Sequence, residues 1–136
     1  MNIISFIKPK NEVVFLYDDM TVEETIEIME KHRFATIPIL SREGNYVGTL
    51  SEGDLLWEIK NIDCYQIEKT RSRVVSQVKR LRDYVAINYN STINMLIAKA
   101  ADENFVPIVD DSNQFIGIVT RKTLLNYFFE HNFIVL

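Results

Sequence analysis

Apolar and polar residues follow the same order in the two halves of this chain. In the first half, the apolar run at residues 13–16 predicts a strand, and Thr21, with a glutamate three residues later, predicts the start of an amphipathic helix. Two β-rich runs, Thr36–Leu40 and residues 46–50, flank a polar turn and predict a hairpin. A second helix is expected over residues 52–59 and completes a β-α-β-β-α unit.

The second half repeats this order of elements. A strand is predicted over residues 84–87, and the apolar stripe from Ile93 to Ala100 predicts a helix. The runs Phe105–Val109 and 115–119 predict a second hairpin. A closing helix is expected over Arg121–Glu130.

An alignment of the two halves confirms that the sequence is repeated. An offset of 71 positions aligns residues 4–8 with residues 75–79. After a two-residue shortening the offset becomes 69, and it pairs three motif residues in the same order: Pro38 with Pro107, Gly48 with Gly117 and Ser51 with Thr120. We therefore predict an α+β fold of two βαββα units packed as a pseudo-two-fold pair, with copy one over 1–60, a linker over 61–74 and copy two over 75–136.

The composition narrows the classes of partner. The 136 residues carry a net charge of −4, and the basic run from Lys69 to Arg82 has no interleaved aromatic residue, so neither nucleic acid nor a membrane surface is an expected partner. Cys64 is the only cysteine, which excludes an internal disulfide and favours a cytoplasmic protein. No apolar run is long enough to span a membrane.

Candidate catalytic and metal-binding groups are sparse. His32 and His131 have no cysteine or carboxylate partners at ligand spacing, so we expect no metal site and no cofactor beyond a regulatory ligand. No local motif places a Ser–His–Asp or Cys–His set, and no glycine-rich loop is present to cradle a phosphate. The sequence therefore predicts a protein that is not an enzyme.

Each repeat carries a hydrophobic-Pro-hydrophobic strand, a polar turn and a Gly-x-x-Ser/Thr element before its last helix. In copy one these residues read Ile37-Pro38-Ile39 and Gly48-Thr49-Leu50-Ser51-Glu52-Gly53-Asp54. In copy two they read Val106-Pro107-Ile108 and Gly117-Ile118-Val119-Thr120-Arg121-Lys122-Thr123. Each copy resembles a CBS domain, and the tandem resembles the Bateman module of stand-alone bacterial CBS proteins.

The resemblance implies a regulatory adenine nucleotide bound in the cleft between the two copies. Asp54 would lie in the first turn of a helix, where a carboxylate can accept both hydroxyls of a ribose, and Ser51 would lie where free N–H groups face a phosphate. The resemblance also implies an adenine slot in each copy, formed by Val13, Val14, Ala35, Thr36 and Ile37, and by Tyr84, Val85, Asn104, Phe105 and Val106.

Copy two departs from the motif because Thr123 stands where the ribose-binding aspartate is expected. Thr120 remains, and Arg121 and Lys122 place two cations at the expected phosphate position. A similar run occurs in stand-alone CBS pairs that bind cyclic di-AMP. The choice among AMP, ADP, ATP, S-adenosylmethionine, NAD-like ligands and cyclic di-AMP stays open, and one good site per chain is expected.

Two other interpretations of the same residues remain open. Ser51 and Asp54 also have the spacing of an ordinary helix cap, and Arg121 and Lys122 also suit a solvated helix surface. The chain would then be a ligand-free scaffold for dimerisation or docking.

A homodimer is predicted in either case. Trp57 and the aromatic segment from Tyr127 to Leu136 exceed what one short helix needs for its own core. The resemblance implies that such pairs dimerise through their helices and signal to a regulated protein that the sequence does not identify.

Overall fold

The structure, a computed structural model, describes residues 3–60 and 71–131. Two compact units divide the chain: one is Val14–Asp83, and the other joins Met1–Val13 to Tyr84–Leu136. Most of the predicted linker, Cys64 and the apolar residues 133–136 lie outside the described residues. No helix in the described part of the chain is long and apolar enough to cross a membrane.

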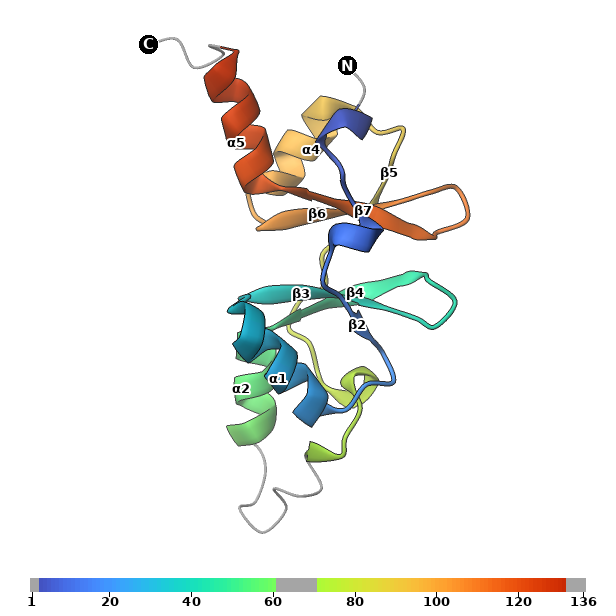
Figure 1. Ribbon diagram of the computed structural model, residues 1–136, viewed down its shortest axis with the longest axis vertical. Coiled ribbons are helices and arrows are strands. Elements are labelled where there is room, and N and C mark those ends of the chain that lie inside the picture. The colour runs from blue at the N-terminus through green and yellow to red at the C-terminus, as the bar shows by residue number, and fades with distance from the viewer. Residues whose placement is uncertain (1–2, 61–70, 132–136) are drawn as a thin grey trace. The chain divides into compact units, whose positions relative to one another are not determined.

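The Val14–Asp83 unit, called here the copy-one unit, has a three-stranded sheet in the order β2-β3-β4. Strand β2 is parallel to β3, and β3 and β4 form an antiparallel hairpin. Helices α1 and α2 cover the same face of this sheet (Figure 1). The elements are β2 (Leu16–Tyr17), α1 (Val22–His32), β3 (Thr36–Leu40), β4 (Tyr46–Ser51), α2 (Glu52–Lys60) and the 3-10 turn η4 (Val75–Gln77).

The other unit, called the copy-two unit, has a four-stranded sheet in the order β1-β7-β6-β5. Strand β5 is parallel to β6, and β6 and β7 form the equivalent hairpin. Helices α4 and α5 cover one face of this sheet (Figure 1). The elements are η1 (Ile4–Phe6), β1 (Lys8–Pro9), η2 (Lys10–Glu12), β5 (Ile87–Asn88), α4 (Ile93–Ala100), β6 (Phe105–Val109), β7 (Phe115–Thr120) and α5 (Arg121–Glu130).

The predicted α+β class, hairpins and helices are confirmed. The capping residue of α1 is Thr21, whose hydroxyl accepts the Glu24 backbone N–H at 3.1 Å, as the sequence predicts. Thr92 caps α4 in the same way through the Met95 N–H. Local side-chain chemistry therefore sets these helix starts.

The predicted positions of the first strands are wrong by several residues. Strands were expected over 13–16 and 84–87, but the parallel ladders contain only Leu16–Tyr17 and Ile87–Asn88. The apolar residues before each ladder make no strand pairs there, and Val14 packs against the core instead. At Val14 and Tyr84 the apolar side chain is packed without strand pairing, whereas Val85 is exposed.

Each unit has its own hydrophobic core between its helices and its sheet. In the copy-one unit, Leu16, Ile37, Ile39 and Leu50 are fully buried and cluster with α1 residues such as Val22. In the copy-two unit, the cluster includes Leu96 from α4 and Val106, Ile108 and Val119 from the hairpin. Each fully buried aliphatic side chain contributes about 1.5–3 kcal/mol of transfer free energy.

The N-terminal segment belongs to the copy-two unit, although the sequence places it in the first repeat. Strand β1 pairs with β7 antiparallel, with Pro9 opposite Gly117, and Ile3 and Phe6 are buried in the copy-two core. Gly117 has a φ of 156°, and a β-carbon there would collide with the backbone carbonyl of Lys8. The glycine is therefore required for this strand pairing.

Candidate functional site

The first part of the candidate site is the junction between β4 and α2. The Ser51 hydroxyl accepts the Asp54 backbone N–H, and Asp54 Oδ2 accepts the Ser51 backbone N–H, each at 3.0 Å. The two residues thus cap the start of α2 reciprocally. The capping interpretation of this pair is therefore correct, and it leaves part of the carboxylate available for other partners.

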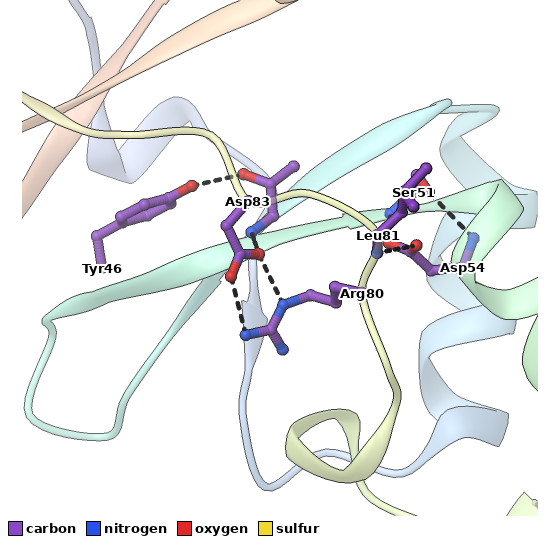
Figure 2. Close-up of polar contacts among 7 residues, drawn as sticks. Tyr46, Ser51, Asp54, Arg80, Leu81 and Asp83 are labelled. Carbon is purple, nitrogen blue, oxygen red and sulfur yellow. Dashed lines mark hydrogen bonds and ion pairs between the residues drawn. The ribbon is translucent and has the colours of Figure 1, made fainter.

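Asp54 is buried, with only 5% of its surface exposed. Its Oδ1 accepts the backbone N–H of Leu81 at 3.0 Å, across 27 positions of sequence (Figure 2). Hydrogen bonds from two backbone amides hold the carboxylate in place at both oxygens and offset the cost of burying its charge. Residues 79–83, which we call the 79–83 segment, therefore lie beside the motif.

A second aspartate fastens the 79–83 segment to the hairpin. Asp83 Oδ1 accepts the Thr49 backbone N–H at 3.0 Å and pairs with Arg80 Nε at 2.7 Å (Figure 2). The Thr49 hydroxyl is 2.7 Å from the hydroxyl of Tyr46. A β-carbon at Gly48 would collide with the Asp83 carboxylate, so the motif glycine makes room for this contact.

A cavity of about 290 Å³ adjoins Asp54 within the copy-one unit. Its lining consists of Asp54, Trp57, Glu58, Lys79 and Leu81. Acidic acceptors, one ammonium group and two large apolar side chains therefore border the same space. Ligand pockets combine apolar walls with a few polar groups, as this cavity does. Its volume is close to the lower end of the range of about 300–1,000 Å³ that such pockets have.

The other predicted copy-one residues are partly brought together. Thr36 pairs with Ser51 across the β3–β4 hairpin, and the Glu52 N–H donates to the Ala35 carbonyl at 2.9 Å, so Ala35 and Thr36 flank the α2 start. Ile37 is fully buried in the core cluster, against which Val14 packs. Val13 belongs to the other compact unit, so it is not part of the copy-one cluster described here.

Copy two has a hydroxyl pair where copy one has a carboxylate. The Thr120 hydroxyl caps α5 by accepting the Thr123 N–H at 3.2 Å, and it lies 2.8 Å from the Thr123 hydroxyl. A threonine offers one neutral hydroxyl oxygen in place of two charged carboxylate oxygens, so it is a weaker acceptor for a pair of ribose hydroxyls. The predicted difference between the copies is thus present in the geometry.

The predicted adenine-slot residues of copy two lie around one strand end. The centroids of the Tyr84 and Phe105 rings lie 5.0 Å apart, and the Tyr84 hydroxyl accepts the Asn104 N–H at 3.4 Å. Phe105 pairs with Thr120 across the hairpin, and Val106 is its buried neighbour. Val85 is exposed.

The two predicted phosphate-binding cations of copy two differ in placement. Arg121 Nε donates to the Ala100 carbonyl at 2.7 Å, which ties the guanidinium to the groove between α4 and α5. Lys122 is exposed. The structure therefore places Arg121 on the helical face of its unit.

Sequence reasoning identified the cations of the 79–83 segment only as part of a basic run, and it missed the contacts of Leu81 with Asp54 and of Asp83 with Thr49. One signal was present: residues 79–83 align with residues 8–12, which form β1 and η2, at the offset of 71. The paired glycines of the motif are a second signal, because each marks a close approach to one of these segments. No group of three metal-ligating side chains occurs among residues 3–60 and 71–131.

Solved structures with this fold include stand-alone CBS proteins. CbpB in complex with c-di-AMP has a TM-score of 0.84 and 22% identity, and the match covers 98% of this chain and 89% of that one. CBSX2 in complex with AMP has a TM-score of 0.74 and 19% identity over 96% of this chain and 98% of that one. At these identities the likeness concerns the fold.

Sequence comparison also finds relatives that are longer than this chain. The uncharacterized protein RP505 of Rickettsia prowazekii is 30% identical over 116 residues, which are 85% of this chain and 34% of that protein. The chain spans about a third of the length of this relative. The family model for the CBS domain matches residues 4–61 and 75–130, one match for each repeat. With both repeats matched and the CBS-pair fold formed, this chain belongs to the CBS domain family.

Proposed function

We propose that this protein is a non-catalytic regulatory module that binds an adenine nucleotide through copy one and signals to a partner protein. The observation that carries the proposal is the Asp54 carboxylate, which is buried, fixed by two backbone amides and open to a cavity. Family membership and the nucleotide complexes of CbpB and CBSX2 support the class of ligand.

The proposed contacts follow from the chemistry of each group. A carboxylate oxygen has two acceptor positions, so Asp54 Oδ2 retains capacity for one ribose hydroxyl beside the Ser51 N–H, and a second ribose hydroxyl would take the place of the Leu81 N–H at Oδ1. Lys79 borders the same cavity and can pair with a phosphate. Ser51, Ala35 and Thr36 complete the proposed site at the start of α2.

The proposed route to regulation is the 79–83 segment. A ribose that displaces the Leu81 N–H from Asp54 frees one of the contacts that fasten this segment to copy one, leaving the Asp83–Thr49 contact. A ligand shifts an equilibrium only between states that it binds unequally, and competition for Asp54 provides such a difference. The partner protein would then respond to the position of the segment.

Isothermal calorimetry with AMP, ATP and cyclic di-AMP tests the proposal. At least one nucleotide is expected to bind, and Asp54→Ala is expected to weaken it about tenfold or more, because charge-assisted hydrogen bonds contribute about 1.5–3 kcal/mol each. Asp54→Asn tests the charge alone, and Thr123→Ala is the matched control in copy two. Binding that Asp54→Ala leaves unchanged would contradict the assignment and favour a site at Arg121 and Lys122. No binding of any of the three nucleotides would favour the ligand-free scaffold.

A gain-of-site variant tests the difference between the copies. Thr123→Asp is expected to add a second, weaker nucleotide site per chain, because it places a carboxylate three residues after Thr120 in the first turn of α5. The measured quantity is the calorimetric stoichiometry. Thr123→Asn, which lacks the charge, is expected to leave the stoichiometry unchanged, and an unchanged value for Thr123→Asp would contradict this assignment.

We also propose that the chain is a homodimer and turns over no nucleotide. Phe129 and Trp57 are exposed on helices α5 and α2, where they are available to a partner. Light scattering at micromolar concentration is expected to give twice the chain mass. Chromatography of ATP or cyclic di-AMP after incubation with the pure protein is expected to show no product.

A further inference from the structure

The chain reaches the sheet of each unit through the same local structure. The turns η1 and η4 are equivalent at the offset of 71, and each closes with a bond from the next amide, Ile7 N–H to the Ile4 carbonyl and Val78 N–H to the Val75 carbonyl. Ile7 has φ −76° and ψ 124°, and Val78 has φ −76° and ψ 125°. Each packs on the core of its own unit. The two backbones are therefore equivalent up to these residues.

The two segments diverge at the next residue. In copy two, β1 pairs with β7, and Lys8 lies opposite Ile118. In copy one, the repeat partner of Lys8 is Lys79, and that of Ile118 is Thr49. Among the described residues, Lys79 joins no strand, and β4 is an edge strand of its sheet. Equivalent segments thus reach equivalent sheet edges, but only one of them pairs.

The Asp83 carboxylate takes the position of the missing strand. Its Oδ1 accepts the Thr49 N–H at 3.0 Å (Figure 2). A β-carbon at Gly48 would meet this carboxylate, whereas one at Gly117 would meet the Lys8 backbone carbonyl. Relative to the motif glycine, a side-chain oxygen in copy one therefore replaces the strand carbonyl of copy two. Charged side chains on an edge strand prevent pairing, so a strand can pair here only after Asp83 leaves.

We propose that the 79–83 segment has a second conformation, in which its first two residues pair with β4 as β1 pairs with β7. The register of β1 sets Lys79 opposite Thr49. Directly opposite residues of an antiparallel pair exchange two hydrogen bonds or none, and the Thr49 N–H points away from β3, so these two residues exchange both. Gly48 leaves room for the incoming carbonyl, as its repeat partner does in copy two.

The second conformation is the one that the nucleotide favours, and this step rests on the proposed function. The bond from the Leu81 N–H to Asp54 holds the segment in the unpaired conformation. A ribose that replaces this N–H removes the restraint and leaves the Asp83–Thr49 contact as the competitor of pairing. Nucleotide binding therefore promotes pairing, and pairing strengthens nucleotide binding by the same factor. Asp83 thus lowers the affinity for nucleotide.

Amide hydrogen exchange of the wild-type protein is the first test. With AMP, ATP or cyclic di-AMP at saturation, whichever binds, exchange at the Lys79 amide is expected to slow about tenfold, because this N–H gains a ladder bond. Exchange at the Leu81 amide is expected to accelerate, because its acceptor is lost. An unchanged or faster rate at Lys79 would show release of the segment without pairing and would overturn the inference.

Removal of the competing carboxylate tests pairing without any nucleotide. In ligand-free Asp83→Ala, exchange at the Lys79 amide is expected to be about tenfold slower than in wild type, because a charge-assisted contact no longer occupies the Thr49 N–H. Asp83→Asn keeps one acceptor oxygen and is the matched control, with a smaller change expected. Adding Gly48→Ala to Asp83→Ala is expected to abolish the slowing. Exchange at Lys79 that does not slow in Asp83→Ala contradicts the second conformation.

Calorimetry of the single variant Gly48→Ala distinguishes pairing from simple release of the segment. Pairing predicts nucleotide binding weakened about fivefold or more, since the added methyl group blocks the ladder. Simple release predicts tighter binding, because the same group pushes Asp83 away from Thr49. Unchanged or tighter binding is therefore evidence against pairing. Thermal melts of each variant verify that it is folded.

These tests separate this inference from the proposed function. Absence of nucleotide binding would contradict the proposed function and the part of the nucleotide in pairing, whereas slower Lys79 exchange in ligand-free Asp83→Ala would still support the second conformation. Nucleotide binding that depends on Asp54, together with Lys79 exchange that Asp83→Ala does not slow, would overturn this inference alone.

Discussion

Replacing Asp54 with alanine is expected to destabilise the protein by about 2–4 kcal/mol, because the Ser51 and Leu81 amides lose a charged acceptor in a buried position. Water entering the adjacent cavity offsets part of this loss. Urea unfolding of wild type and variant measures the change. Hydrogen exchange at the Leu81 amide is expected to accelerate by a larger factor than exchange in β3, which locates the effect.

The controls for this variant separate burial from charge. Thr123→Ala removes the equivalent side chain of copy two, where only one neutral hydroxyl contact and no long-range partner are lost, and is expected to cost about 1 kcal/mol or less. Asp54→Asn keeps one acceptor oxygen and should fall between Asp54→Ala and wild type. Equal losses for Asp54→Ala and Thr123→Ala would show that the Leu81 contact contributes nothing.

Replacing Gly117 with alanine is expected to cost about 2–5 kcal/mol and to detach the N-terminal segment. The added methyl group meets the Lys8 backbone carbonyl, and the φ of 156° is unfavourable for any residue with a side chain. Backbone cannot move aside without breaking the β1–β7 ladder. Denaturant unfolding measures the total loss, and proteolysis near residues 1–13 measures detachment.

Gly48 provides the matched comparison. The three atoms nearest to a methyl group there belong to the Asp83 carboxylate, a side-chain end that is 39% exposed and can rotate away from the hairpin by giving up its bond to the Thr49 N–H. Gly48→Ala is therefore expected to cost about 1 kcal/mol, the value of the lost Thr49 contact. A larger loss for Gly48→Ala than for Gly117→Ala would contradict this account of the two glycines.

Local sequence patterns were sufficient to predict much of the fold. The hairpins follow from β-rich runs around polar turns, and the start of α1 follows from Thr21, whose hydroxyl accepts an amide three residues later. The spacing of Ser51 and Asp54 likewise predicts their reciprocal contact. These features depend on contacts between residues that are close in the sequence, so the side-chain types at those positions are enough to predict them.

The predicted first strands failed because apolar residues can be buried without joining a ladder. Val14 packs on the copy-one core, but the parallel pairing begins only at Leu16. A run of apolar residues indicates burial and does not indicate which of its amides find a strand partner. The boundaries of these short strands depend on the neighbouring strand.

By itself, the sequence determined that the chain contains two repeats of a β-α-β-β-α unit, that Asp54 has no carboxylate equivalent in copy two, and that the helices of the repeats differ in charge. Only the tertiary structure decided that the Leu81 amide holds Asp54, that β1 pairs with β7, and that Glu52 and Arg121 line equivalent grooves. For the first two the physical reason is that every residue except proline offers the same backbone N–H, so the sequence does not identify which residue is the partner in a long-range contact to the main chain. The groove linings depend on how the helices pack.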